Sequence, residues 1–309
     1  MKIKIILFAM TTAIGLVACS SDEEKTTVNS GLVPIRLSAN ADEAVTRAGQ
    51  GIQNTQFDAK QDIDVQITSA NGNTNYDMLT YFTSDTEGTL QPKKGVFPYY
   101  PVDKSNVNIR AIYPAGYMNT STFSVRNPQK VKADYMASDL MFADTAGVEP
   151  SANVVQLKFK HKMTKICVNL TKKGGVDLRN SKVKLLGVKV QTSFNPLTGE
   201  VTKEGASGSN YDLPITDNGY INSACIIVPQ VVPSGYLLEI VLANNDILHY
   251  KTVQDMIFES GKVYTFNVDV IESDITVRTE VTPWDTDSDG DGTTDTNDDV
   301  EERLKLASN

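Results

Sequence analysis

The sharpest chemical pattern in the sequence is a run of aspartates near its end. Carboxylates stand at relative positions 1, 3, 5, 9 and 12 of one stretch: Asp287, Asp289, Asp291, Asp295 and Asp298. Gly292 takes position 6, where a calcium loop turns sharply, and Thr293 at position 7 offers a carbonyl oxygen. Alternate carboxylates can converge on one hard cation because the ion neutralises their repulsion. The spacing therefore predicts a Ca²⁺ site, with a solvated acidic tail as the alternative.

Patterns that carry enzymatic chemistry are missing from the sequence. It contains no Gly-x-Ser-x-Gly elbow, no His-Glu-x-x-His, no phosphate loop and no paired-cysteine zinc spacing. The two histidines, His161 and His249, are far apart in segments predicted to be strands, and we expect each to pack or bond locally. The Asp-rich stretch resembles calcium loops of the EF-hand and thrombospondin-repeat type, although Asp298 stands where an EF-hand has a bidentate Glu. We predict a protein that is not an enzyme and needs no cofactor beyond this Ca²⁺.

The first eighteen residues have the features of an export signal. Lys2 and Lys4 precede a mainly apolar run, Ile5 to Val17, which is short for a membrane span. The run ends in Leu16-Val17-Ala18-Cys19, which resembles the lipobox of bacterial lipoproteins. The resemblance implies cleavage before Cys19 and acylation of its thiol, which would hold the chain on the outer membrane. An ordinary signal peptide with an incidental cysteine is the alternative.

The residues after Cys19 form a polar tether over 19–30 that includes Asp22-Glu23-Glu24. An acidic stretch at this place is similar to the signal that exports lipoproteins of the Bacteroides group to the cell surface, with retention on the periplasmic face as the alternative. The formal net charge is -9. An acidic chain repels phosphates, so we expect no nucleic-acid partner.

The other two cysteines, Cys167 and Cys225, lie inside apolar runs. We expect two buried free thiols that act as small hydrophobic side chains. A disulfide between them is the alternative in an oxidising compartment, because the sequence gives no distance between the two sulfur atoms.

Short segments of strict alternation dominate the chain beyond residue 30. Apolar and polar residues alternate over 62–67, 107–112, 155–160, 182–185, 238–242 and 262–268. Turn signals such as Asn71-Gly72, Thr86-Glu87-Gly88 and Lys173-Gly174-Gly175 separate these segments. Alternation of this kind is typical of sheets with one buried face. The pattern predicts an all-β protein, and the length predicts two β-sandwiches that divide near 147–151.

Several phrases, in this order and spacing, resemble the fimbrillin family, the subunits of type V pili of Bacteroides-like bacteria. They are Val45-Thr46-Arg47-Ala48, Phe97-Pro98-Tyr99-Tyr100-Pro101, Ile109-Arg110-Ala111-Ile112-Tyr113-Pro114, the segments 135–143 and 157–165, Ile226-Ile227-Val228-Pro229-Gln230, Gly261-Lys262-Val263-Tyr264 and Val281-Thr282-Pro283-Trp284. The match spans roughly residues 31–284 and looks closest to the fimbrillin-like branch of accessory or tip subunits.

The resemblance implies a fold of two tandem transthyretin-like Greek-key β-sandwiches. The domains would be a signal peptide (1–18), the tether (19–30), an N-terminal sandwich (31–150), a C-terminal sandwich (151–284) and an acidic tail (285–309). Residues 31–47 would include a propeptide strand, Leu32–Leu37, that is released when a protease cuts between Arg47 and Ala48. For Arg47 the alternative is an ordinary exposed linker residue.

The same resemblance implies the function. A strand of the next subunit would fill the groove left by the propeptide strand, by β-strand addition. The donor candidate is 275–281, with an edge strand of its own sheet as the alternative. We therefore expect a structural or tip subunit of a cell-surface pilus that supports adhesion. Its partners would be other pilus subunits, the outer membrane, and a host or bacterial surface ligand. The alternative is a non-polymerising surface lipoprotein that binds a glycan or host ligand.

Overall fold

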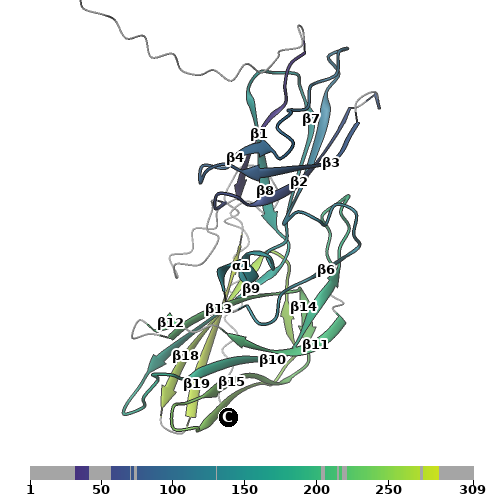
Figure 1. Cartoon of the computed structure of the whole chain (residues 1–309). Helices are drawn as coiled ribbons and strands as arrows, with labels where there is room; N and C mark the ends of the chain where they lie inside the picture. The colour runs from purple at the N-terminus through teal and green to yellow at the C-terminus, as the bar shows by residue number, and fades with distance from the viewer. Residues whose placement is uncertain are drawn as a thin grey trace, which may run out of the picture. The chain divides into compact units, whose positions relative to one another are not determined.

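The computed structural model describes residues 32–41, 57–69, 71–72, 75–129, 131–202, 206–213, 216–217, 221–271 and 274–284. From Val33 onward the chain forms one compact unit, and of the preceding unit, Met1–Leu32, only Leu32 is described. Strands dominate this part of the chain, and its single helix is the short α1 (Lys132–Met136) (Figure 1). The prediction of an all-β protein is confirmed.

Seven strands form a sheet that closes on itself. Its order is β1 (Arg36–Ala41), β4 (Thr89–Pro92), β3 (Asn75–Thr83), β2 (Asp62–Ser69), β5 (Val107–Tyr113), β7 (Met141–Val148) and β8 (Val154–His161). The ring is complete because β1 pairs with β4 on one side and with β8 on the other. The sequence predicted a two-sheet sandwich here, and the observed sheet is a closed barrel.

Alternation in the sequence becomes alternation of burial in this barrel. In β2 the side chains of Ile63, Val65 and Ile67 point inward and are fully buried, while Gln66 between them is half-buried. They share a core with the inward residues of the other six strands and with Phe57, whose ring meets Tyr113 and Phe159 edge-on. A strand with one buried face produces this period of two.

Two further sheets face each other across a second core. One contains β11 (Ala206–Leu213), β10 (Lys182–Ser193), β15 (Gly235–Val241) and β16 (Ile247–Thr252), and β6 (Thr122–Ser124) also pairs with β10. The other runs β12 (Thr216–Asp217), β13 (Ile221–Ile227), β9 (Thr164–Lys172), β18 (Lys262–Ile271) and β19 (Asp274–Pro283). A small sheet of β14 (Gln230–Val232) and β17 (Met256–Phe258) completes the set. Buried residues of both large sheets form one continuous cluster, as in a sandwich.

The change from the first core to the second differs from the predicted boundary at 147–151. Those residues connect β7 to β8, which pair with each other inside the barrel. The second core begins after β8, with Met163 and β9. It also takes in an earlier segment, because β6 pairs with β10 and Phe123 and Tyr135 are buried there. The two cores therefore do not divide the chain at one point.

Candidate functional site

The residues predicted to carry the function lie outside the described residues. This holds for the lipidation candidate Cys19 and for the cleavage candidates Arg47 and Ala48. It also holds for the calcium candidates Asp287, Asp289, Asp291, Asp295 and Asp298. Within the described ranges, no group of three or more His, Cys, Asp or Glu side chains could hold a metal ion. The structure does describe the predicted propeptide strand and the predicted donor segment.

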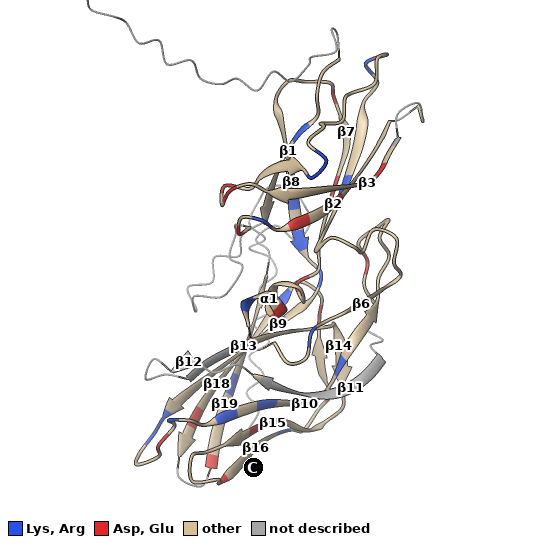
Figure 2. Ribbon diagram, in the orientation of Figure 1, with Lys and Arg blue, Asp and Glu red and all other residues tan. Residues whose placement is uncertain are grey.

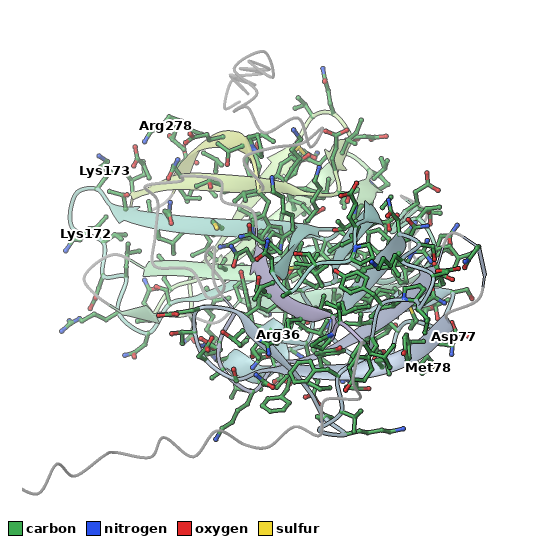
Figure 3. All side chains as sticks on the ribbon, turned by 90° about the horizontal axis from the view of Figure 1, so that it is seen from above. Arg36, Asp77, Met78, Lys172, Lys173 and Arg278 are labelled. Atoms are coloured by element: carbon green, nitrogen blue, oxygen red, sulfur yellow. The ribbon has the colours of Figure 1, made fainter. Side chains whose placement is uncertain are left out.

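The predicted propeptide strand, 32–37, overlaps β1 only at Arg36 and Leu37, and it is β1 that holds the barrel closed. It runs parallel to β8, from Arg36 opposite Val154 to Ala41 opposite Phe159, and antiparallel to β4 at Leu37 and Ser38. The side chains of Leu37 and Ala39 in β1 and of Ile35 just before it point inward and are 2%, 1% and 0% exposed. Arg36 points outward and is exposed (Figure 3). Removal of β1 would leave both β4 and β8 without a partner on one side.

Backbone hydrogen bonds fix both ends of this strand. The amide of Ile35 donates to the carbonyl of Pro98 at 2.8 Å, and the amide of Tyr100 donates to the carbonyl of Val33 at 2.9 Å. At the other end, the amide of Ala39 donates to the carbonyl of Gly88 at 2.8 Å. β1 is thus held by main-chain bonds along its length, as an added strand is held in a groove.

Gly88 lies directly against β1. It ends the turn before β4 and has φ +84°, a conformation that favours glycine. A β-carbon here would overlap the carbonyl oxygen of Ala39 and lie 3.0 Å from its carbonyl carbon. The sequence identified Thr86-Glu87-Gly88 only as a turn. The contact with β1 could not be foreseen because the two residues are far apart in the sequence.

The predicted cleavage site follows β1 directly in the chain. β1 ends at Ala41, and the next described residue is Phe57, which is buried in the barrel core. Arg47 and Ala48 lie between these two points, outside the described residues. A cut there would break the covalent connection between β1 and the following strands of the barrel. The hydrogen bonds and side-chain contacts of β1 described above would remain.

The predicted donor segment 275–281 lies in β19, at the edge of its own sheet. β19 pairs with β18 in unbroken register from Asp274 opposite Ile271 to Pro283 opposite Lys262. Ile275 and Val277 point into the second core and are 8% and 9% exposed. The structure therefore places this segment in the alternative position, as an edge strand within the chain.

The end of β19 is held by an aromatic stack. Trp284 is 6% exposed and stacks on His161 with ring centroids 4.0 Å apart and planes 5° apart. The Nδ1 atom of His161 lies 2.8 Å from Oδ1 of the buried Asp139. The ammonium group of Lys165 lies 5.7 Å above the Trp284 ring, within cation–π range. His161 thus packs and bonds locally, as the sequence predicted.

The two remaining cysteines are both free. Cys225 is buried on β13, and Cys167 is half-buried on the neighbouring strand β9. Burial raises the pKa of both thiols above the ordinary value for cysteine, which disfavours the reactive thiolate. The prediction of free thiols is confirmed.

A family profile decides what these elements belong to. The profile described as fimbrillin-like matches residues 46–284, which is well over half of the sequence. The chain belongs to the fimbrillin-like family. The match begins after β1, at the residue before Arg47, and it ends at Trp284.

Solved structures show the same fold as this fimbrillin-like chain. A candidate cell adhesion protein from Bacteroides ovatus aligns with a TM-score of 0.67 and 23% identity, over 82% of this chain and 98% of that one. One from Bacteroides uniformis gives 0.64 and 19%, over 81% and 98%. One from Bacteroides fragilis gives 0.50 and 12%, over 81% and 98%. No curated protein matches the sequence.

The described part of the fimbrillin-like chain contains no helix that is long and apolar enough to span a membrane. The lipid attachment predicted at Cys19 concerns a residue outside that part.

Proposed function

We propose that this chain is a structural or tip subunit of a cell-surface pilus, which matures by cleavage between Arg47 and Ala48 and assembles by β-strand exchange. One observation carries the proposal: β1 completes the barrel between β4 and β8, yet the chain continues from it directly into the segment that contains Arg47. The fimbrillin-like match supports it, because the matched region starts at residue 46 and leaves β1 out.

The groove left by β1 would be unstable without a replacement. Burial of a side chain such as Ile35 or Leu37 contributes about 1.5–3 kcal/mol each. The main-chain hydrogen bonds to Gly88 and Pro98 contribute about 0.5–1.5 kcal/mol each. Together these values are comparable to the whole net stability of a domain, about 5–15 kcal/mol. A cleaved subunit that has lost β1 would therefore be driven to accept another strand.

The incoming strand must reproduce the inward side chains of β1, which are two large apolar residues followed by a small one. The segment Ile275-Thr276-Val277-Arg278-Thr279 of a second copy has this order. Ile275, Val277 and Thr279 would take the places of Ile35, Leu37 and Ala39. Side-chain pockets of alternate depth then supply the specificity of the joint, while main-chain bonds supply its affinity.

The remaining parts of the proposal concern the cell surface. Acylated Cys19 would hold the precursor on the outer membrane, and the acidic residues after it would direct it outward. The second core would correspond to a transthyretin-like Greek-key sandwich. The aspartates of 287–298 would bind extracellular Ca²⁺. As a pilus subunit the chain would support adhesion to a host or bacterial surface ligand.

A second function is favoured by a different observation. Tyr236 on β15 presents an aromatic ring that is 61% exposed. The chain could instead be a surface lipoprotein that never polymerises and binds a glycan or host ligand.

N-terminal sequencing of material sheared from the cell surface tests the first function. The polymerised protein should begin at Ala48. An Arg47→Ala variant should accumulate as an unpolymerised precursor. Arg36→Ala is the matched control, because it removes an exposed arginine of β1 away from the predicted cleavage site. Sheared protein that begins upstream of Arg47, or polymers formed normally by Arg47→Ala, would exclude this maturation and leave the second function.

A further inference from the structure

One exposed sheet face carries an aromatic ring surrounded by charged side chains. Among the tyrosine, phenylalanine and tryptophan residues whose burial the structure describes, only Tyr236 has an exposed side chain, at 61%. It lies on β15, directly opposite Lys251 on β16. The next outward row crosses three strands: Lys184 on β10, Glu239 on β15 and His249 on β16. These five residues are called the Tyr236 patch.

Contacts within the Tyr236 patch hold its polar groups in place. The ammonium group of Lys184 donates to Oε1 of Glu239 at 2.7 Å, and Nε2 of His249 lies 3.4 Å from Oε2 of the same carboxylate. The hydrogen bond from Lys184 lowers the pKa of Glu239, so this carboxylate stays ionised. The His249 ring also meets the Tyr236 ring, with centroids 4.8 Å apart. The sheet thus fixes both the ring and its polar border before any ligand arrives.

The Tyr236 patch carries an excess of positive charge. Glu239 already pairs with Lys184, so it does not compensate Lys251. The ammonium group of Lys251 lies 5.9 Å above the Tyr236 ring, and among the described residues no carboxylate forms an ion pair with it. Lys173 and Arg278, labelled in Figure 3, differ in this respect, because Asp269 lies 3.8 Å from Lys173 and 3.3 Å from Arg278. Lys251 is therefore free to meet an external anion on a chain whose net charge is -9.

The size of the patch indicates a small ligand. Three neighbouring strands span about 10 Å, and the two outward rows lie about 7–10 Å apart along the strands, so the patch covers roughly 100 Å². A stable protein interface buries about 800 Å² on each partner around an apolar centre. Here the exposed ring is bordered by His249 and Lys251 instead. Basic residues on β10 continue the polar border (Figure 2).

We propose that the Tyr236 patch binds a sugar ring that carries a carboxylate. The apolar face of a pyranose would stack on the Tyr236 ring, whose hydroxyl group remains available as a polar contact. The carboxylate would pair with Lys251, in a charge-assisted hydrogen bond. Hydroxyl groups of the sugar would reach His249 and Glu239, which can accept or donate at fixed positions. This inference does not depend on strand exchange, because β1 and β19 take no part in it.

Saturation-transfer NMR on the full chain tests this inference with two probes, a galacturonate trisaccharide and its neutral galactose counterpart. The acidic probe should bind in the millimolar range and more tightly than the neutral one. Tyr236→Ala should weaken binding about tenfold, as truncation of an aromatic hot spot does, while Tyr236→Phe should retain most of it. Lys251→Gln should abolish the preference for the acidic probe.

Leu197→Ala serves as the matched control, since Leu197 is 59% exposed and lies in the turn after β10, outside the patch. It should bind as the parent chain does. The proposal is overturned if neither probe binds at millimolar concentration, if Tyr236→Ala binds normally, or if both probes bind equally. It is also overturned if Tyr236→Ala abolishes self-association seen by light scattering while no probe binds, because the face would then be a protein contact.

Discussion

Replacement of Gly88 by alanine should loosen β1 before any cleavage takes place. Gly88 has φ +84°, and a β-carbon there would overlap the carbonyl oxygen of Ala39 in β1. Gly95, just after β4, is the matched control: its φ is +70°, and a β-carbon there meets nothing within 4 Å. Both Gly88→Ala and Gly95→Ala carry the same backbone strain. Only Gly88→Ala displaces β1.

The free-energy cost of Gly88→Ala follows from the contacts between Gly88 and β1. A left-handed conformation costs a residue with a β-carbon about 1–2 kcal/mol, and this cost is common to both variants. Relief of the overlap in Gly88→Ala must also break the hydrogen bond from the Ala39 amide to the Gly88 carbonyl, about 1 kcal/mol. That corresponds to about a fivefold rise in the population of opened β1. If Leu37 leaves the core as well, about 1.5–3 kcal/mol more is lost.

Amide hydrogen exchange measures this opening directly, because it reports the free energy of local unfolding. The amide of Ala39 should exchange at least about fivefold faster in Gly88→Ala than in Gly95→Ala. The amide of Ile35, bonded to Pro98 at the other end of β1, separates two outcomes. If exchange of the Ile35 amide also becomes faster, β1 opens as one unit. Equal exchange of both amides in the two variants would refute the argument that Gly88 holds β1 in place.

Further predictions concern other parts of the chain. Leu37→Ala should lower the free energy of unfolding by about 2–5 kcal/mol, measured by urea denaturation, because a buried leucine of the barrel core is removed. Cys19→Ser should release the protein from membranes, and normal partition of the variant with the outer membrane would contradict the lipoprotein interpretation. Calorimetry should detect Ca²⁺ binding at about 10⁻⁴ to 10⁻³ M, and an Asp289→Asn/Asp291→Asn variant should lose that heat. Emission of Trp284, the single tryptophan, should shift to longer wavelength on polymerisation if β19 leaves its sheet, and stay unchanged if β19 remains.

Local patterns made most of the strands predictable from the sequence. The alternating segments at 62–67, 107–112, 155–160 and 262–268 all lie inside observed strands, β2, β5, β8 and β18. Alternation is a local property, since each strand buries one face whichever strand lies beside it. The absence of a long helical period likewise agrees with the single short helix in the described residues.

Pairing between distant segments could not be predicted. Nothing in residues 36–41 or 154–159 indicates that these segments lie side by side in parallel, although this pairing closes the barrel. Two buried glutamines give another example. The Gln129 side chain both donates to and accepts from the backbone of Ile226, and Gln230 does the same with Lys189. Each side-chain amide makes the pair of backbone hydrogen bonds that a neighbouring strand would otherwise make. This role depends on contacts that exist only in the folded protein.

The candidate site was predictable in part for the same reason. The phrase Val45-Thr46-Arg47-Ala48 could be read from one short segment, and its role in cleavage stays a prediction; the strand before it was predicted at 32–37 and observed at Arg36–Ala41. Gly88 and Tyr236 could not, because their roles depend on contacts with Ala39 and Lys251 across strands.

The energetics of β19 explain why cleavage at Arg47 would be needed for assembly. If β19 moved into the groove of a second copy, its inward residues Ile275 and Val277 would gain there about what they lose beside β18. Trp284 would in addition leave its stack on His161 and uncover the buried pair with Asp139. Exchange of β19 for an intact β1 would therefore not be favourable by itself. Cleavage after Arg47 would let β1 dissociate, and the empty groove would then have no strand that competes with an incoming one. In the proposed mechanism, a proteolytic step would thus give direction to an exchange that contacts alone would leave close to balance.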